Sequence, residues 1–597
     1  MIEPRIYRAA FAPALLAFVL MMFSLEGRPA PLPQSGPADV LFDGRSADQQ
    51  LQSIVQQAPS RKPGSPGDQS IAGVLVHRFR QQGFVTTVQR WNEDGKKLRN
   101  VIGRRAGVSQ KTIVVMAGRD SHRVPDATGS AGDTAALLEL GRVFQGRAAD
   151  KTLELVSVDG QTLGDAGARH FAETLQNRGD VVAVIALSNL AAPRSRGPLV
   201  IGWSNDSRRG SIGLERTAAQ SLRFELGQVP SQPLAPGQLL RLAFPIGIGA
   251  QGVLLERGVE ALRISGSGEI EPPARDTQVD DVNVNRYGEL GRGVIRTVAA
   301  LDASSKPPEH GPRSYITLAG QAMPGWSIAL FALTLILPAL FAEVDAFARV
   351  RRRRQPVGRW LWWLAGAVIP FAIGLAVAEF LSLVGVGTDA PPAPVDPSQA
   401  GLDSGAIVTM SLAAAATALA WFLLRSRVVR RAGKLPPTPA APGAACVVSL
   451  AMTLAALWMW FLNPYMALLV IPAVHCWMLA TQTELRPRTA AALVTLGVLP
   501  WIVLALFYLV RLDLDPLHGL WYLTLLVTGA AIGLPTALLG CVLLGIFASV
   551  VAVVRARAKE WSPPERPSAR DDVPSVFGPG GHAGPGMLGG TESTIRR

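Results

Sequence analysis

Seven long apolar segments dominate the region between residues 324 and 554. Most of them approach the roughly 20 residues that a helix needs to cross the hydrocarbon core of a bilayer. The seven segments are Trp326–Leu340, Trp360–Val384, Ala406–Leu424, Ala444–Leu462, Tyr465–Ala480, Ala490–Leu509 and Leu520–Val554. They predict a transmembrane bundle of about seven helices. The last segment contains Gly533 and Pro535 near its middle, so it is compatible with one kinked span or with two short ones.

Charge alternates between the loops that connect these segments. Basic residues follow the first, third, fifth and last segments: Arg349, Arg351, Arg352, Arg353, Arg354, Arg359, Arg425, Arg427, Arg430, Arg431, Lys434, Arg486, Arg488, Arg555, Arg557 and Lys559. The other loops carry acidic residues, namely Asp389, Asp396, Asp403, Asp513 and Asp515. Because cytoplasmic loops concentrate Lys and Arg, this alternation predicts about eight spans with both termini inside. Two spans in the last segment would instead put the C-terminus outside.

The N-terminal apolar stretch Ala9–Leu25 follows two arginines. It fits a cleaved signal peptide or a retained signal anchor, and no small-residue cleavage site follows it closely. We therefore favour an anchor over residues 1–27, with a Pro- and Gly-rich linker over residues 28–47. Both interpretations place the segment that follows outside the cytoplasm.

The composition excludes several classes of protein. Only 17% of the 597 residues are charged, against about 25% in ordinary soluble domains. The net charge of +13 lies largely in the loops described above, so it reports membrane topology and contact with anionic lipid and gives no sign of a nucleic-acid partner. The three cysteines, Cys446, Cys476 and Cys541, all lie in apolar segments, which excludes a disulfide framework or zinc finger in the first 400 residues.

Residues 48–303 read as a soluble α/β domain. Lys111–Ala117, Leu153–Val158 and Val181–Leu187 are typical of buried strands, and Thr134–Phe144 and Leu163–Leu175 of amphipathic helices. Strands that alternate with helices predict a mostly parallel sheet flanked by helices. We expect a second linker over residues 304–323, the bundle over 324–554 and a disordered cytoplasmic tail over 555–597.

Four blocks of this domain carry a resemblance to a known family. They are Asn100–Gly103, Lys111–Ser121, Asp133–Leu140 and Val158–Ala172, in that order. In order and spacing the blocks resemble the di-zinc aminopeptidases of peptidase family M-28. The resemblance implies a zinc-exopeptidase fold, two zinc ions bridged by a carboxylate, and a glutamate that acts as general base.

Residue by residue, the family's zinc ligands are missing from this sequence. Gly118 stands where the family has its first ligand histidine, and Thr128 or Gly129 where it has the bridging aspartate. Gln161 and Thr162 replace the paired glutamates, and Ser188 replaces a further aspartate; no histidine follows between residues 175 and 302. An amide such as that of Gln161 cannot take a proton from water. The resemblance therefore implies a degenerate metal site and a pseudoenzyme without a cofactor.

An alternative keeps the chemistry but moves the site. Asp120, His122 and Asp126 lie close together in the sequence and include ligand types that zinc accepts. A rearranged site there would make the protein an active metallopeptidase. Other polar residues nearby, Asp133, Asp159 and Asp165, fit solvated loops or structural roles, and His77 and His170 fit surface or packing positions. No Gly-x-Ser-x-Gly motif supports a serine nucleophile.

Two ionisable residues lie within the predicted spans. Glu379 and His475 would mark a proton or substrate path if they faced a cavity, which favours a transporter component. The simpler expectation is that Glu379 reaches the outer interface and that His475, as a neutral imidazole, bonds to another helix.

The sequence thus leaves three functions open. The first is a bacterial-type multi-pass membrane protein whose extracytoplasmic domain (residues 28–323) is inactive and binds a peptide, a polymer or a protein partner. The second is an active membrane-bound metallo-aminopeptidase that needs zinc. The third is a transporter component. The layout is similar to membrane-bound M-28 members and to the M-28-like subunit of the eukaryotic GPI transamidase, which implies a precedent for a scaffold.

Overall fold

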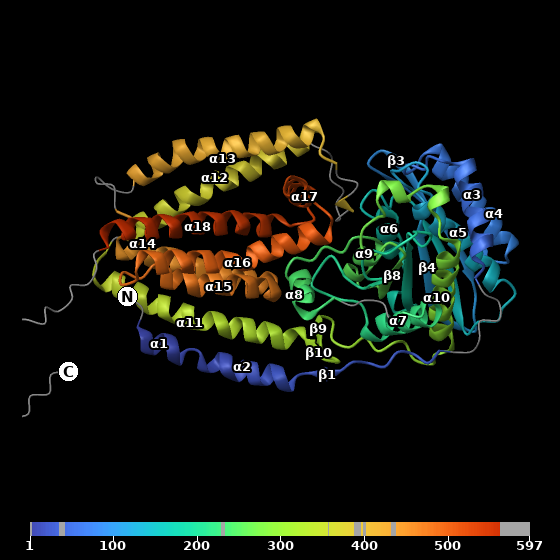
Figure 1. The fold of residues 1–597 in the computed structure, drawn as a ribbon, viewed down its shortest axis with the longest axis horizontal. Coiled ribbons are helices and arrows are strands. Elements are labelled where there is room, and N and C mark those ends of the chain that lie inside the picture. Colours follow the sequence, from blue (N-terminus) through green and yellow to red (C-terminus); the bar gives the residue numbers. More distant parts are fainter. Residues whose placement is uncertain are drawn as a thin grey trace, which may run out of the picture.

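The computed structural model describes residues 3–34, 42–228, 233–355, 357–386, 396–397, 401–431 and 438–561. It has two parts, an α/β domain and a bundle of long helices, which lie end to end (Figure 1). The predicted fold class is confirmed for both parts.

A seven-stranded mixed sheet forms the centre of the domain, in the order β2-β3-β5-β4-β6-β8-β7. Its strands are β2 (Val85–Glu93), β3 (Lys96–Arg105), β4 (Ser109–Gly118), β5 (Lys151–Val158), β6 (Val181–Ser188), β7 (Val200–Ile201) and β8 (Ala261–Ser265). The four inner strands β5, β4, β6 and β8 are parallel, whereas β2, β3 and β7 pair antiparallel at the edges. The three strands expected from apolar runs are therefore three of the four inner parallel strands, and β8 was not predicted.

Helices cover both faces of the sheet, which explains why the inner strands are apolar throughout. They are α3 (Gly44–Gln57), α4 (Pro66–Gln81), α5 (Gly132–Phe144), α6 (Ala166–Thr174), α7 (Ile212–Leu226), α9 (Ala250–Glu256) and α10 (Val284–Ala303), while α8 (Ala235–Ala243) lies between the domain and the bundle. In β4, Ile113 and Val115 face the core that includes α3, α5 and α10, while Val114 and Met116 face the core under α6 and α9. The helices expected over Thr134–Phe144 and Leu163–Leu175 correspond to α5 and α6.

The second part contains the apolar helices. They are α1 (Pro4–Ala9), α2 (Ala12–Phe23), α11 (Gly325–Arg352), α12 (Gly358–Leu383), α13 (Ser404–Arg431), α14 (Pro442–Leu462), α15 (Pro464–Ala480), α16 (Pro487–Arg511), α17 (Pro516–Thr528) and α18 (Leu534–Glu560). Among the described residues, seven helical segments are long and apolar enough to cross a membrane, counting residues 4–23 as one; α15, with 17 residues, is shorter. The chain is thus a membrane-spanning protein by the length and composition of its helices.

The last apolar segment resolves into two unequal helices. The short α17 has 13 residues, lies at the end of the bundle next to the domain, and is followed by a turn near Gly533 (Figure 1). The 27-residue α18 then runs the length of the bundle and continues to Glu560, into the segment expected to begin the tail. One full-length span therefore stands where the sequence allowed one or two; residues 562–597 of the predicted tail lie outside the described residues.

A small sheet occupies part of the predicted linkers. Strands β9 (Tyr315–Leu318) and β10 (Gln321–Pro324) form a hairpin, and β1 (Glu26–Gly27) adds to its edge. The turn at Ala319 and Gly320 has positive φ at both residues, which is the geometry that two-residue hairpins favour. Because these strands are two to four residues long, the linker composition around them hid their signal.

The described basic segments lie at the end of the bundle away from the domain, and Lys434 lies outside the described residues. The last residues of α11, α13 and α18 and the first residues of α16 carry them, and each of these helix ends points away from the sheet (Figure 1). The acidic Asp403, Asp513 and Asp515 lie at the opposite helix ends, beside the domain.

The domain packs directly onto the bundle. Trp203 and residues of α8 share one continuous apolar core with Tyr465 and Trp521 of the bundle. The Asn463 side chain donates to the carbonyl of Leu242 over 2.7 Å, which ties the start of α15 to α8. The joint is therefore a packed interface in addition to the chain connections.

Candidate functional site

The carboxyl ends of the parallel strands meet at one edge of the sheet, where α/β folds place their ligand sites. Gly118 ends β4 at this edge, and the side chain of Gln161 lies over it. A Cβ atom at position 118 would lie 1.5 Å from Oε1 of Gln161. The space into which a ligand side chain at position 118 would project is thus filled by an amide of the same chain.

The next acidic residue, Asp120, makes its hydrogen bonds with the loop that contains Gln161. Its carboxylate accepts hydrogen bonds from the backbone amides of Gln161 and Thr162, at 2.8 and 2.9 Å, and from the Thr162 hydroxyl at 2.8 Å. Burial raises the pKa of Asp120, and the neighbouring Asp159 adds to this, while the three donors act against it. The Asp120 carboxylate therefore fixes the loop at Gln161 and Thr162, the two residues that stand where the resembled family has its paired glutamates.

The remaining positions of the resembled site also have structural roles. The Thr128 hydroxyl donates to the carbonyl of Asp276 over 2.7 Å. A Cβ atom at Gly129 would lie 2.3 Å from the Asp126 carboxylate, which caps the turn by accepting from the Ser130 amide at 2.9 Å. These positions leave little room for a bridging carboxylate.

The loop after β6 is held from below by Asp133. Its carboxylate accepts from the backbone amides of Asn189 and Leu190, at 2.8 and 2.9 Å, and the Asn189 side chain contacts the Ser188 hydroxyl at 3.1 Å. Burial raises the pKa of Asp133 to about 7, against the pull of the two amides. Asp133 thus binds the backbone of this loop, and Ser188 contacts the Asn189 side chain.

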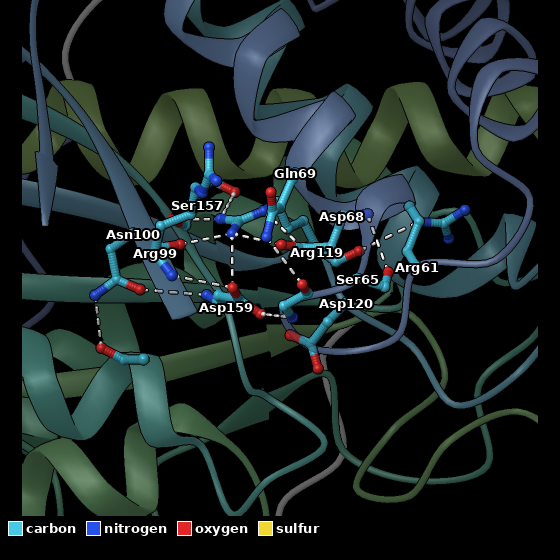
Figure 2. A network of polar contacts seen from close by, with 12 residues as sticks. Arg61, Ser65, Asp68, Gln69, Arg99, Asn100, Arg119, Asp120, Ser157 and Asp159 are labelled. Carbon is cyan, nitrogen blue, oxygen red and sulfur yellow. Dashed lines mark hydrogen bonds and ion pairs between the residues drawn. The ribbon is translucent and has the colours of Figure 1, made fainter. Parts of the chain in front are cut away.

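A buried ion network lies directly behind the edge (Figure 2). Arg119, which is completely buried, forms ion pairs with Asp68 of α4 at 2.8 Å and with Asp159 at 3.1 Å. Asp159 also accepts from the backbone amides of Gly64 and Arg99. Burial raises the pKa of Asp68, although Arg119 opposes the shift. The network connects the ends of β4 and β5 with α4 and with β3.

A second buried arginine, Arg61, closes the network on the other side. Its guanidinium donates to the carbonyls of Arg119, Ala58 and Pro125 and to the Ser130 hydroxyl, at 2.8–3.2 Å. Burial lowers the pKa of Arg61, and nearby aspartates oppose this shift.

A third buried arginine extends from β8 toward the same acids. Arg263 donates to the Glu269 carbonyl over 2.7 Å, and its charge interacts with Asp165 and Asp133. Burial raises the pKa of Asp165 to about 7, and Arg263 opposes the shift. Three guanidinium groups thus supply the positive charge among the buried carboxylates of this edge.

The three residues of the rearranged-site hypothesis face different partners. Asp120 and Asp126 are engaged as described above. The partly exposed His122 lies 3.8 Å from Glu271, and burial together with Arg123 lowers the pKa of its imidazole. In the part of the chain that the structure describes, no group of three or more His, Cys, Asp and Glu side chains is placed to hold a metal ion.

The donor set of this edge does not fit two zinc ions. Such ions need imidazoles and carboxylates with free lone pairs that converge on one point. Here Gln161 covers Gly118, the Asp120 carboxylate accepts three hydrogen bonds, and Arg119, Arg61 and Arg263 carry the positive charge. Each of these features would have to change before a metal could bind in the resembled arrangement.

The same edge is joined to the helix bundle. Beyond β8, the buried Glu269 forms ion pairs with Arg241 of α8 and with Arg511 of α16, the latter at 2.7 Å. Burial acts to raise the pKa of Glu269, but Arg241 and Arg511 outweigh it and hold the pKa below its ordinary range. Beyond β6, Arg196 pairs with Asp513 at 3.0 Å.

A loop between two membrane helices reaches this edge as well. The carboxylate of Asp396, which lies between α12 and α13, accepts from the backbone amide of Glu271 over 2.6 Å. Residues that follow two of the inner strands, β6 and β8, thus contact residues from the ends of membrane helices. The carboxyl edge of the sheet faces the bundle.

The two polar residues noted within the spans lie in unlike surroundings. His475 uses both ring nitrogens, Nδ1 with the Tyr7 hydroxyl and Nε2 with the Leu335 carbonyl, each at 2.9 Å. A neutral imidazole with its proton on Nε2 satisfies both bonds, so His475 connects α15 to α1 and α11. Glu379 is partly exposed on α12, near the end beside the domain.

Several charged residues of this region were not recognised in the sequence. They are Arg61, Arg119, Arg241, Arg263, Glu269 and Arg511. A signal existed for Arg263, because it interrupts an apolar run that fits a buried strand. The other residues lie in loops or at helix ends, where an arginine or a glutamate is ordinary.

Among the outer residues, His170 stacks on Trp91 with ring centroids 4.2 Å apart, in line with the packing position expected for it. His77 lies on the surface of α4 within hydrogen-bond distance of Gln81.

Comparisons with known proteins find likeness in the fold of the domain. The glutaminyl cyclase of an Acidobacteriales bacterium is 16% identical with a TM-score of 0.35, covering 45% of this chain and 99% of its own. The zinc aminopeptidase BSAP of Bacillus subtilis is 11% identical (TM-score 0.37, 45% and 99% covered), and a leucine aminopeptidase precursor of Bacteroides thetaiotaomicron is 16% identical (0.37, 45% and 99%). No family model and no curated protein matches the chain. Membership of family M-28 thus stays a prediction, and the likeness carries no information about activity.

Proposed function

We propose that the α/β domain is a catalytically inactive module of a membrane protein and serves as a binding or scaffold domain. The observation that carries the proposal is the position of Gln161, whose amide oxygen occupies the space above Gly118. A ligand side chain and this amide cannot share that space.

The proposal is also supported by the chemistry of the groups that remain. The Gln161 amide is not basic, so it cannot activate water as a carboxylate would. Asp120 accepts three hydrogen bonds within its own loop, and withdrawing it would leave two backbone amides without partners. We therefore infer that no zinc ion resides at this edge.

The scaffold role is supported by the contacts of the same edge with the bundle. Where an exopeptidase would admit substrate, Glu269 pairs with Arg511 and Glu271 contacts Asp396. These contacts couple the orientation of the domain to the positions of α16 and the α12–α13 loop. We propose that the domain presents its outer surface to a peptide, polymer or protein partner and transmits binding to the bundle.

The orientation in the membrane follows from the charge distribution. All basic clusters lie at the end of the bundle away from the domain, and such clusters mark cytoplasmic loops. We propose that residues 28–323 are extracytoplasmic, that the N-terminal helix is a retained anchor, and that the C-terminal tail is cytoplasmic.

Metal analysis of the purified full-length protein tests the inactivity. We expect less than one zinc ion in ten molecules and no aminopeptidase activity above that of a His122→Ala variant. Two zinc ions per chain, together with activity that a chelator abolishes, would refute the proposal. Activity that His122→Ala removes, while the matched surface variant His77→Ala retains it, would establish the rearranged site.

Protease protection tests the orientation separately. In intact cells, an external protease should leave a C-terminal epitope tag uncleaved and should cut an equivalent tag inserted in the exposed turn at Asp94 and Gly95 of the domain. Cleavage of the C-terminal tag from outside would overturn the proposed topology while leaving the zinc result unaffected.

A further inference from the structure

A cavity of about 160 Å³ opens at the end of the bundle away from the domain, between α11, α14 and α15. Its polar lining includes Glu343, Arg349, Arg353, Ser449 and Thr481. The first apolar segment was predicted to end at Leu340, whereas α11 continues to Arg352 and carries Glu343 beyond the predicted end. No part of the proposed function of the domain uses this cavity.

Glu343 is the unusual member of the lining. Only 3% of its surface is exposed, and no hydrogen bond or ion pair joins it to a residue that the structure describes, while the charges of the chain's N-terminus and of Arg349 act on it from a distance. A carboxylate removed from water without a partner costs several kcal/mol of free energy. The side chain lines the cavity, so a cationic or hydrogen-bond-donating group inside it would provide what the described protein residues do not.

The mouth of the cavity has the opposite charge. Arg349 and Arg353 lie six and ten residues after Glu343, which at 1.5 Å per residue places them roughly 9 and 15 Å further along the axis of α11. Arg349 pairs with Asp345 at 2.8 Å, and Arg353 is the exposed residue that follows the last residue of α11. Helical side chains lean toward the N-terminus, so the Arg349 guanidinium leans back toward Glu343.

Hydroxyl groups line the wall between the two charges. The Ser449 and Thr481 hydroxyl oxygens are 3.5 Å apart, and Thr481 donates to the Met478 carbonyl over 2.9 Å. Because the Thr481 hydroxyl donates to the Met478 carbonyl, its lone pairs can accept a hydrogen bond from Ser449 or from a ligand. The cavity thus offers an acid and acceptors inside and two guanidinium groups outside.

We propose that this cavity binds a small zwitterionic group with a primary ammonium and a phosphate, the chemistry of an aminophospholipid headgroup. The ammonium would bond to Glu343 and the Ser449 hydroxyl, and the phosphate would pair with Arg353 and Arg349. Basic pockets between membrane helices at this depth bind lipid headgroups, and the buried carboxylate adds selectivity for an amine. A quaternary ammonium has no N–H to donate, so it fits less well.

The test uses the purified, delipidated full-length protein in detergent micelles. Native mass spectrometry would measure the binding of phosphatidylethanolamine and of phosphatidylcholine with identical acyl chains. We expect at least tenfold tighter binding of phosphatidylethanolamine. Glu343→Gln should abolish this preference, and Arg353→Ala should weaken both lipids severalfold, whereas the neighbouring Arg352→Ala, outside the cavity, should change neither.

Equal binding of the two lipids by the unaltered protein, or a preference that survives Glu343→Gln, would overturn the proposal. If Glu343→Gln does not fold, the two arginine variants still decide, because equal effects of Arg353→Ala and Arg352→Ala would also overturn it. Free phosphoethanolamine separates the two sources of the group: competition with the lipid supports a soluble ligand, and its absence a membrane lipid.

Discussion

The carboxyl edge of the domain sheet and the cavity at the far end of the bundle both contain buried charge, but they balance it differently. At the edge, Arg119 forms ion pairs with both Asp68 and Asp159. In the cavity, no described residue forms a hydrogen bond or an ion pair with Glu343, and Arg349 acts on it only from a distance. A buried charge that lacks a direct contact and lies beside an open volume points to a ligand more strongly than a charge held in an ion pair.

The largest loss of stability is expected when the central arginine of the buried network at the edge is replaced. Arg119→Met leaves Asp68 and Asp159 buried beside each other, and removing one partner of a buried ion pair costs about 3–5 kcal/mol of stability. Denaturant unfolding of the purified protein measures the loss. As the control, Arg104→Ala breaks the half-exposed pair with Glu154 and should cost less than about 1 kcal/mol. Equal losses in the two variants would show that the network is not what stabilises the edge.

A cycle of substitutions sharpens the assignment of Gln161. Gly118→Ala forces a methyl group against the Gln161 amide and should cost about 1–3 kcal/mol, as overpacked cores do. Gln161→Ala removes the obstacle, so the double variant should recover most of that loss in the same unfolding experiment. Additive costs would contradict the geometry at the end of β4.

The pH dependence of stability tests the acids near Arg263. The folded pKa of Asp165 is about 7, above its ordinary value near 4, so the folded state holds a proton that the unfolded state has lost between these values. Stability should therefore fall as the pH rises from about 4 to 7, by at most about 1.4 kcal/mol per pH unit for this group. Asp133, whose pKa is also raised to about 7, contributes over the same range, so Asp165→Asn should reduce the slope without removing it, and an unchanged slope would exclude Asp165 as a source.

The smallest effects on stability are expected for substitutions that remove no hydrogen bond or ion pair. Glu343→Gln replaces an unpartnered carboxylate by a neutral isostere, so the ligand-free protein should be as stable as before or slightly more stable. Glu379→Gln, on a partly exposed position of α12, should change stability by less than about 0.5 kcal/mol. Thermal unfolding of the delipidated protein measures both, and a large loss for Glu343→Gln would mean that Glu343 has a structural partner.

Hydropathy and charge in the sequence were enough to predict the long helices, three of the four inner strands and the basic clusters, because each depends on a short window of residues. The fourth inner strand, β8, was not predicted. Sequence order also identified Gly118, Gln161 and Ser188 as unlike the residues of the resembled enzymes. The hairpin β9–β10 and the separate short helix α17 were not predicted, because the sequence patterns that mark them are only a few residues long.

Tertiary structure alone decided which charges meet. Arg119 reaches Asp68 across 51 positions of sequence, Glu269 reaches Arg511 across 242, and the amide of Gln161 fills the space above Gly118. A sequence records which residues are charged, but the free energy of a buried charge depends on the partner that the folded chain brings to it. For this reason the sequence could predict only that the zinc ligands of the resembled family are missing, and the contacts of Gln161, Asp120 and Arg119 became visible only in the fold.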